Sequence, residues 1–158
     1  MGLIGASMGA GAIAGGLIAL RVAPRRPLVV ANLVLIPAAL QPLAMAVPLP
    51  AAGIMAVCVV GWAGLTYLNE VWNATVPQLI PADVLARANS FDWLLSIIAM
   101  PIGFAVAGPV ADHVGIPATL VAGAALMAVP CALIVLVPGV RQVRRTADGR
   151  IAFQAAAP

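Results

Sequence analysis

Four polar side chains share one face of a helical segment that is otherwise apolar. Thr66, Asn69, Glu70 and Asn73 follow the spacing i, i+3, i+4, i+7, which places them on one side of an α-helix. Trp62 extends the same face by one turn, and we call these five residues the polar stripe. Glu70 is the only glutamate of the chain. A lone carboxylate on such a stripe has the chemistry to bind a proton or a cationic group.

A second interpretation of Glu70 is structural. Glu70 lies near the end of its apolar segment, where water reaches a carboxylate and where Arg87 of the following loop offers an ion-pair partner. Asn32 and Gln41 lie within another apolar segment. Either they line a cavity together with the polar stripe, or they form hydrogen bonds across neighbouring helices. The sequence leaves both pairs of alternatives open.

The sequence has no set of residues that would support enzyme catalysis or metal binding. The chain has one histidine, His113, and its two cysteines, Cys58 and Cys131, lie in different apolar segments. No Ser/His/Asp set, phosphate-binding loop or metal-ligand cluster occurs. We therefore expect no enzyme activity, no cofactor and no metal. The pI is near 9.7, but only 4% of residues are aromatic and there is no soluble basic domain, so we expect no nucleic-acid partner.

The amino-acid composition predicts the helices that position the polar stripe. Of 158 residues, 63% are hydrophobic and 8% are charged, and mean hydropathy is +1.10. A soluble domain needs far more charge at its surface. A bilayer is crossed by about 20 apolar residues, which form a helix because lipid satisfies no backbone polar groups. The sequence therefore predicts an all-α membrane bundle of five transmembrane helices, at about 2–22, 28–47, 53–72, 91–114 and 117–140.

Small residues predict where these helices pack. Gly5, Gly9 and Gly16 fall on one face of the first segment, and a further pair of glycines occupies positions 11 and 15. Small residues let helix backbones approach closely, which matters where lipid supplies no hydrophobic driving force. We expect Gly5, Gly9 and Gly16 to contact another helix, and Gly108 to do so in the fourth segment. Such contacts either hold two helices tightly or let them slide.

The third loop predicts a short amphipathic helix of its own. Pro81 suits the first position of a helix, and Asp83 and Arg87 form an i,i+4 pair on its polar side. Ser90 is then expected to cap a separate fourth span. Asp92 lies in the first turn of that span, where the helix dipole favours an acid.

Arginine alternates between the loops and so predicts the topology. It flanks the first loop, occurs in the third and recurs in the tail, at Arg21, Arg25, Arg26, Arg87, Arg141, Arg144, Arg145 and Arg150. Because positive residues concentrate on the cytoplasmic side of membrane proteins, the first and third loops and the C-terminus are predicted to be cytoplasmic. Residues 141–158 are predicted to form a disordered, basic cytoplasmic tail.

Three longer patterns resemble a known family. The first span ends in GLIALRVAPRR at 16–26, the third loop reads NEVWNATVPQLIPADVLARANSFDW at 69–93, and the fourth span ends in AGPVAD at 107–112. These are similar to drug- or siderophore-exporting members of the bacterial major facilitator superfamily (MFS). Gly16, Arg21 and Arg25 match the loop motif of that family. Leu20 stands in place of its acid and Ala23 in place of its second glycine, so the carboxylate that makes the gating contact in the family is absent.

The resemblance covers the whole chain as the C-terminal half of the MFS fold without its first helix, so that residues 1–140 are a partial transmembrane domain. It implies secondary, ion-coupled efflux of a small hydrophobic substrate through the bacterial inner membrane, with a proton as a candidate coupling ion. It also implies that the chain is a fragment that is inactive alone, because the family's substrate cavity lies between two six-helix halves. The partners would be the bilayer and the missing N-terminal half. The alternative is a small non-transport protein that assembles with other membrane proteins.

The alternation of arginines predicts the side of the membrane on which the chain ends. A phosphatase reporter that is active only in the periplasm, fused after Arg150, should give background activity, because the tail arginines hold the C-terminus in the cytoplasm. A fusion in the arginine-free second loop is the matched control and should be active. Strong activity after Arg150 would reverse the predicted topology.

Overall fold

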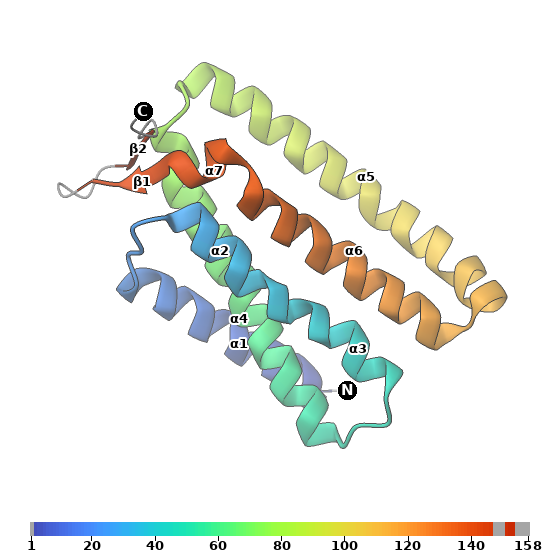
Figure 1. Cartoon of the computed structure of the whole chain (residues 1–158). Helices are drawn as coiled ribbons and strands as arrows, with labels where there is room; N and C mark the ends of the chain where they lie inside the picture. Colours follow the sequence, from blue (N-terminus) through green and yellow to red (C-terminus); the bar gives the residue numbers. More distant parts are fainter. Residues whose placement is uncertain (1, 147–150, 154–158) are drawn as a thin grey trace.

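The computed structural model describes residues 2–146 and 151–153, with side chains for all of these except residues 82, 83 and 153. Within this part of the chain, five helical segments are long and apolar enough to cross a membrane: Gly2–Arg21, Pro27–Ala46, Ala51–Gln78, Val84–Val114 and Ile116–Leu136. The predicted all-α membrane bundle of five spans is therefore confirmed. Figure 1 shows the five segments running roughly alongside one another.

Helix α1 (Gly2–Arg21) packs on α4 (Ala51–Thr75) through three small residues spaced four apart, Ser7, Gly11 and Gly15, which are the buried residues of α1. A Cβ atom on Gly11 or Gly15 would overlap the backbone of Val59 or Ala63. The two backbones therefore touch, as expected where small residues repeat along a membrane helix.

The packing glycines are not the ones predicted. Gly5 and Gly9 face open space, as does Gly108 in the fourth span, so the contacts expected there are not found within the described chain. Gly16 has one neighbour, the Thr66 methyl carbon, which would lie 4.0 Å from an added Cβ. Successive residues of a helix are 100° apart, so the glycines of α1 fall on two faces. One face carries Gly5, Gly9 and Gly16, and α4 packs on the other face, which carries Gly11 and Gly15.

The second span is broken by proline. It consists of α2 (Pro27–Leu35), the 3₁₀ segment η1 (Ile36–Ala39) and α3 (Leu40–Ala46). Pro37 and Pro42 each lack the N–H that would close a helical turn, and the α-helical ladder gives way to a tighter 3₁₀ turn in η1, which contains Pro37. This broken span lies between α4 and α6 (Ile116–Leu136) and contacts both.

Helix α5 (Ala82–Val114) is a single continuous helix, which corrects the predicted separation into a connector helix and a span that starts at residue 91. It follows η2 (Val76–Gln78), and Pro81 is the residue that precedes its first turn. The Ser90 hydroxyl donates to the Ala86 carbonyl at 2.9 Å instead of capping a new helix. Asp92 therefore lies inside the helix and not in its first turn. The expected pair of Asp83 with Arg87 lies outside the described side chains.

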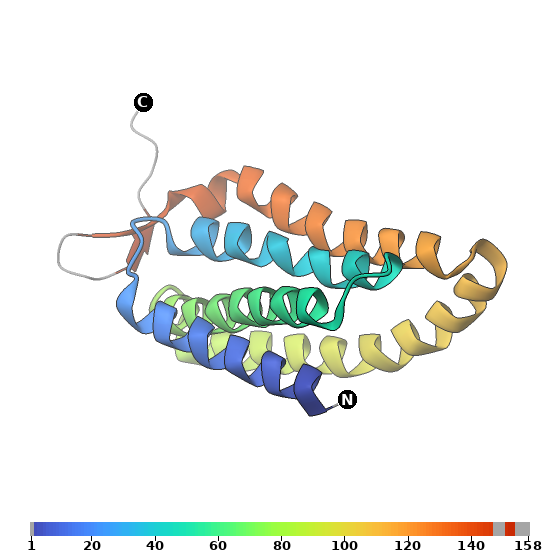
Figure 2. The same cartoon turned by 90° about the horizontal axis from the view of Figure 1, so that it is seen from below.

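A one-residue turn at Gly115 reverses the chain between α5 and α6. Its φ of 89° and ψ of 150° lie in a region that only glycine adopts without strain. Helix α5 has its main contacts with α6, yet none of the residues in its apolar window is buried. Figure 2 shows α5 curving away from α6 on the side of α1 and α4.

The tail is ordered where it is described, which corrects the expectation of a disordered segment. Helix α6 ends at Leu136 and not at residue 140, because Val137 precedes a proline and adopts an extended conformation. The short helix α7 (Pro138–Gln142) follows. Strands β1 (Val143–Arg145) and β2 (Ile151–Phe153) then form an antiparallel pair, which we call the C-terminal hairpin.

The C-terminal hairpin packs on the end of the bundle. Val143 and Ile151 are buried against Leu28 at the start of α2, with Leu79 and Val140 beside them. The same end carries the α1–α2 loop and the α4–α5 connection (Figure 1). We call it the arginine-rich end, since its described arginines are Arg21, Arg25, Arg26, Arg87, Arg141, Arg144 and Arg145.

The contact between α1 and α4 predicts opposite effects for two glycine-to-alanine changes in one helix. Gly15→Ala should lower the free energy of unfolding by about 1–3 kcal/mol, because the added methyl would push the α4 backbone away. Gly9→Ala, which projects into open space, should be neutral or slightly stabilising. Unfolding of both variants in mixed detergent micelles, followed by circular dichroism, measures the difference. Equal effects of the two changes would refute the observed packing.

Candidate functional site

The polar stripe lies at the edge of the contact between α1 and α4. Thr66 is half-buried and faces Gly16 of α1, whereas Asn69, Glu70 and Asn73 are exposed on the open side of α4. Trp62 begins the stripe and is 37% exposed. The opposite face of α4 is the buried one and carries Gly64, Tyr67 and Val71 among others. The predicted alignment of the stripe on one helix face is therefore present, and most of that face is uncovered.

The polar residues of the second span do not join the stripe. The Asn32 amide nitrogen donates to the Leu28 carbonyl in its own helix at 2.8 Å, in place of a hydrogen bond across helices. Gln41 lies flat on Gly61 of α4, where an added Cβ would come within 2.8 Å of its side-chain carbonyl carbon. Both residues therefore serve packing of the broken span.

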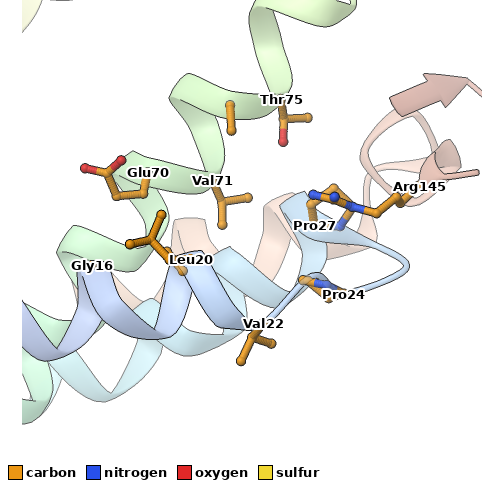
Figure 3. A pocket seen from close by; sticks show the side chains of 11 residues that line it. Gly16, Leu20, Val22, Pro24, Pro27, Glu70, Val71, Thr75 and Arg145 are labelled. Carbon is orange, nitrogen blue, oxygen red and sulfur yellow. The ribbon is translucent and has the colours of Figure 1, made fainter. Parts of the chain in front are cut away.

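A cavity of about 120 Å³ lies where the end of α1, the α1–α2 loop, α4 and β1 meet. Glu70, Thr75 and Arg145 are its polar lining residues. Figure 3 shows Glu70 at one side of this cavity with its carboxylate turned outward, and Arg145 reaching in from the hairpin on the other side. The remaining lining comes from Gly16, Ala19, Leu20, Val22, Pro24, Pro27, Val71 and Ala74.

The residues that match the MFS loop motif lie around this cavity. Gly16 and Leu20 line it, and the Leu20 side chain is 85% exposed where the motif would have an acid. The side chains of Arg21 and Arg25 are exposed beyond it. The Arg25 carbonyl accepts a hydrogen bond of 2.9 Å from the backbone N–H of Arg145. The structure thus brings Gly16 and Glu70 to one cavity but places the two arginines outside it.

Hydrogen bonds to η2 and the α1–α2 loop position the hairpin. The Gln78 side-chain oxygen accepts from the Ile151 N–H at 3.3 Å, while its amide nitrogen donates to the Ala74 carbonyl at 2.7 Å. Together with the bond to Arg25, these contacts hold Arg145 at the cavity. Sequence reasoning missed Arg145 and Thr75 as site residues, because the first was assigned to a disordered tail and the second to the third loop.

A second cavity, of about 380 Å³, lies at the same end between α4, the start of α5 and α7. Its lining is almost wholly apolar and includes Trp72, Leu79 and Val140. Asn89 and Asp92 of α5 supply its polar side chains. Because α5 is continuous through Asp92, the Asp92 carboxylate lies at the apolar lining of this cavity.

No family model, no curated protein and no solved structure matches this chain.

The exposed side of α4 predicts a difference in chemical reactivity between two positions two residues apart. In a Cys58→Ala, Cys131→Ala background, a cysteine at Asn73 should react with a maleimide at least about tenfold faster than one at Thr75. Thr75 is 1% exposed, so a cysteine at this position can react only when the packing around α4 opens locally. Labelling rates in detergent, read by mass spectrometry, give the ratio. Equal rates would show that the stripe is covered or that the α4 packing is different.

Proposed function

We propose that this chain is part of a secondary membrane transporter that moves small hydrophobic molecules. The observation that carries the proposal is the polar stripe on the uncovered side of a membrane span. Polar and ionisable groups facing lipid are unfavourable, at about 2.5 kcal/mol or more for a charge at the membrane centre and less near the interface. A water-filled cavity or a further helix on that side of α4 removes this cost.

The stripe has the composition of a substrate pathway. Trp62 offers an aromatic face, Asn69 and Asn73 offer amide hydrogen bonds, and Glu70 offers a carboxylate that takes up a proton or a cation. In this proposal Glu70 couples ion binding to movement of the substrate. The cavity beside Glu70 is small, so a drug-sized substrate needs the space between this bundle and additional helices.

The resemblance to MFS exporters supplies the finer assignments. On that basis we propose efflux of drugs or siderophores across the bacterial inner membrane, with the arginine-rich end in the cytoplasm. The chain would be inactive alone, because alternating access needs two bundles that rock about a central site. The helices that complete the site would come from the N-terminal half of such a transporter.

A non-transport role is the second candidate, and the exposure of α5 favours it. This span has no buried residue in its apolar window and contacts mainly α6, so most of its surface is available to other membrane proteins. A small subunit that stabilises an assembly through α5 would show the same structure. The DNA upstream of Met1 discriminates the two, since an in-frame coding region for seven further helices is required by the transporter proposal only.

The transport experiment has two arms. The 158-residue chain reconstituted in liposomes with a proton gradient should move no drug from a hydrophobic panel. The full reading frame, expressed in a strain without its own drug exporters, should lower accumulation of a hydrophobic dye. Glu70→Gln should return accumulation to background, because it removes the titratable group but keeps the size of the side chain.

Asp92→Asn is the control for loss of a carboxylate elsewhere and should leave efflux unchanged. Gradient-driven transport by the 158-residue chain, abolished in Glu70→Gln, would overturn the need for further helices. Full efflux by the Glu70→Gln protein would remove Glu70 from the coupling role.

A further inference from the structure

One strand borders both cavities at the arginine-rich end. Arg145 of β1 lines the cavity of about 120 Å³, and Val143 of β1 lines the cavity of about 380 Å³. Residues two apart in a strand point to the same face, so one face of β1 is turned toward the bundle and toward both cavities. Arg144 lies between them and is exposed. The C-terminal hairpin therefore contributes a wall to each cavity.

The contacts that hold the hairpin in this position reach three different elements. The Arg145 N–H donates to the Arg25 carbonyl of the α1–α2 loop at 2.9 Å. The Ile151 N–H donates to the Gln78 side-chain oxygen of η2 at 3.3 Å, and the Ile151 side chain is buried with Leu28 of α2. A two-stranded hairpin is marginally stable by itself, so these contacts determine whether it stays on the bundle.

The helices on either side of the hairpin are held together by contacts of their own. The Arg141 Nε of α7 donates to the Val135 carbonyl near the end of α6 at 2.6 Å, which ties the segment before the hairpin to the bundle. Gly11 and Gly15 hold α1 against the middle of α4. Neither contact involves a residue of β1 or β2. Release of the hairpin therefore leaves the helix packing in place.

The closed position of the hairpin carries an unfavourable contribution. The Arg145 Nε is buried without a hydrogen-bond partner among the described residues. Water binds this donor once the hairpin moves away, so the missing hydrogen bond favours an open position. Burial of the Val143 and Ile151 side chains favours the closed one. Apolar burial thus opposes the cost of the buried donor in one small element.

We propose that the C-terminal hairpin is a lid that opens and closes both cavities at the arginine-rich end. It moves as a unit beyond α7 while the five spans stay packed. In the closed position Thr75, which lines the smaller cavity, is 1% exposed. In the open position water and small solutes reach Thr75 and the apolar lining of the larger cavity. The lid does not depend on the proposed transport, because its motion belongs to this chain alone.

Hydrogen exchange of the unmodified chain in mixed detergent micelles tests the motion. The backbone amides of Arg145 and Ile151 should be at least about tenfold less protected than those of Gly61 and Gly64 in the middle of α4. Opening of the lid frees the first two without unfolding of the bundle. Equal protection of the two pairs would show that the hairpin opens only when the bundle unfolds, and it would overturn the proposal.

Two cysteine reporters separate opening of the lid from loss of the fold. One is Thr75→Cys in the Cys58→Ala, Cys131→Ala background. The other is the native Cys131 in a Cys58→Ala chain, which is buried between the second span and α6. Val143→Asn should raise the maleimide reaction rate at the first reporter by about tenfold or more, because it weakens the burial that closes the lid. The rate at Cys131 should stay within about twofold.

Arg144→Asn is the matched control, since it introduces the same side chain at the exposed position of the same strand. It should change neither rate. An unchanged rate at the Thr75→Cys reporter in Val143→Asn would show that the hairpin does not cover the cavity. An equal rise at both reporters would show that the hairpin and the bundle open together. Either result would overturn the lid.

Discussion

Contact between two helix backbones is the interaction on which the rest of this bundle depends. Between membrane helices there is no hydrophobic driving force, because lipid is as apolar as a side chain, so close packing has to hold them together. Gly11 and Gly15 bring α1 directly onto the backbone of α4. Gly64 does the same for the other neighbour of α4, where an added Cβ would meet the backbone of Val34. Helix α4 is therefore fixed from two sides, and the polar stripe occupies what is left of its circumference.

The spans were predictable from sequence because hydropathy needs no tertiary information. The polar stripe was predictable for a similar reason, since a helix with known period places Thr66, Asn69, Glu70 and Asn73 together whatever surrounds it. The choice of glycine face in α1 was not predictable. Two faces carried small residues, and the one that packs was decided by the position of α4, which no local pattern contains.

The cavity residues were harder still, because they depend on contacts between distant parts of the chain. Arg145 reaches the end of α4 only because Val143 and Ile151 bury their side chains against Leu28. Strands of three residues leave almost no alternating pattern in a sequence, and the arginines of the first strand are typical of a solvated tail. The prediction that Asp92 lies in the first turn of a separate helix was wrong for a local reason. The polar run before it resembled a loop, yet the helix continued through it.

The length of α5 fixes where the bilayer meets the bundle. At about 1.5 Å per residue, the 33 residues of this helix are about 50 Å long, whereas the hydrocarbon layer is about 30 Å thick. Tilting within the usual range of up to about 40° does not absorb the difference. The stretch 93–114 alone is about 33 Å long, so the turns that carry Arg87 and Asp92 stand in the headgroup layer. Trp93, 69% exposed, then anchors the helix at that boundary and sets the depth at which the arginine-rich end sits.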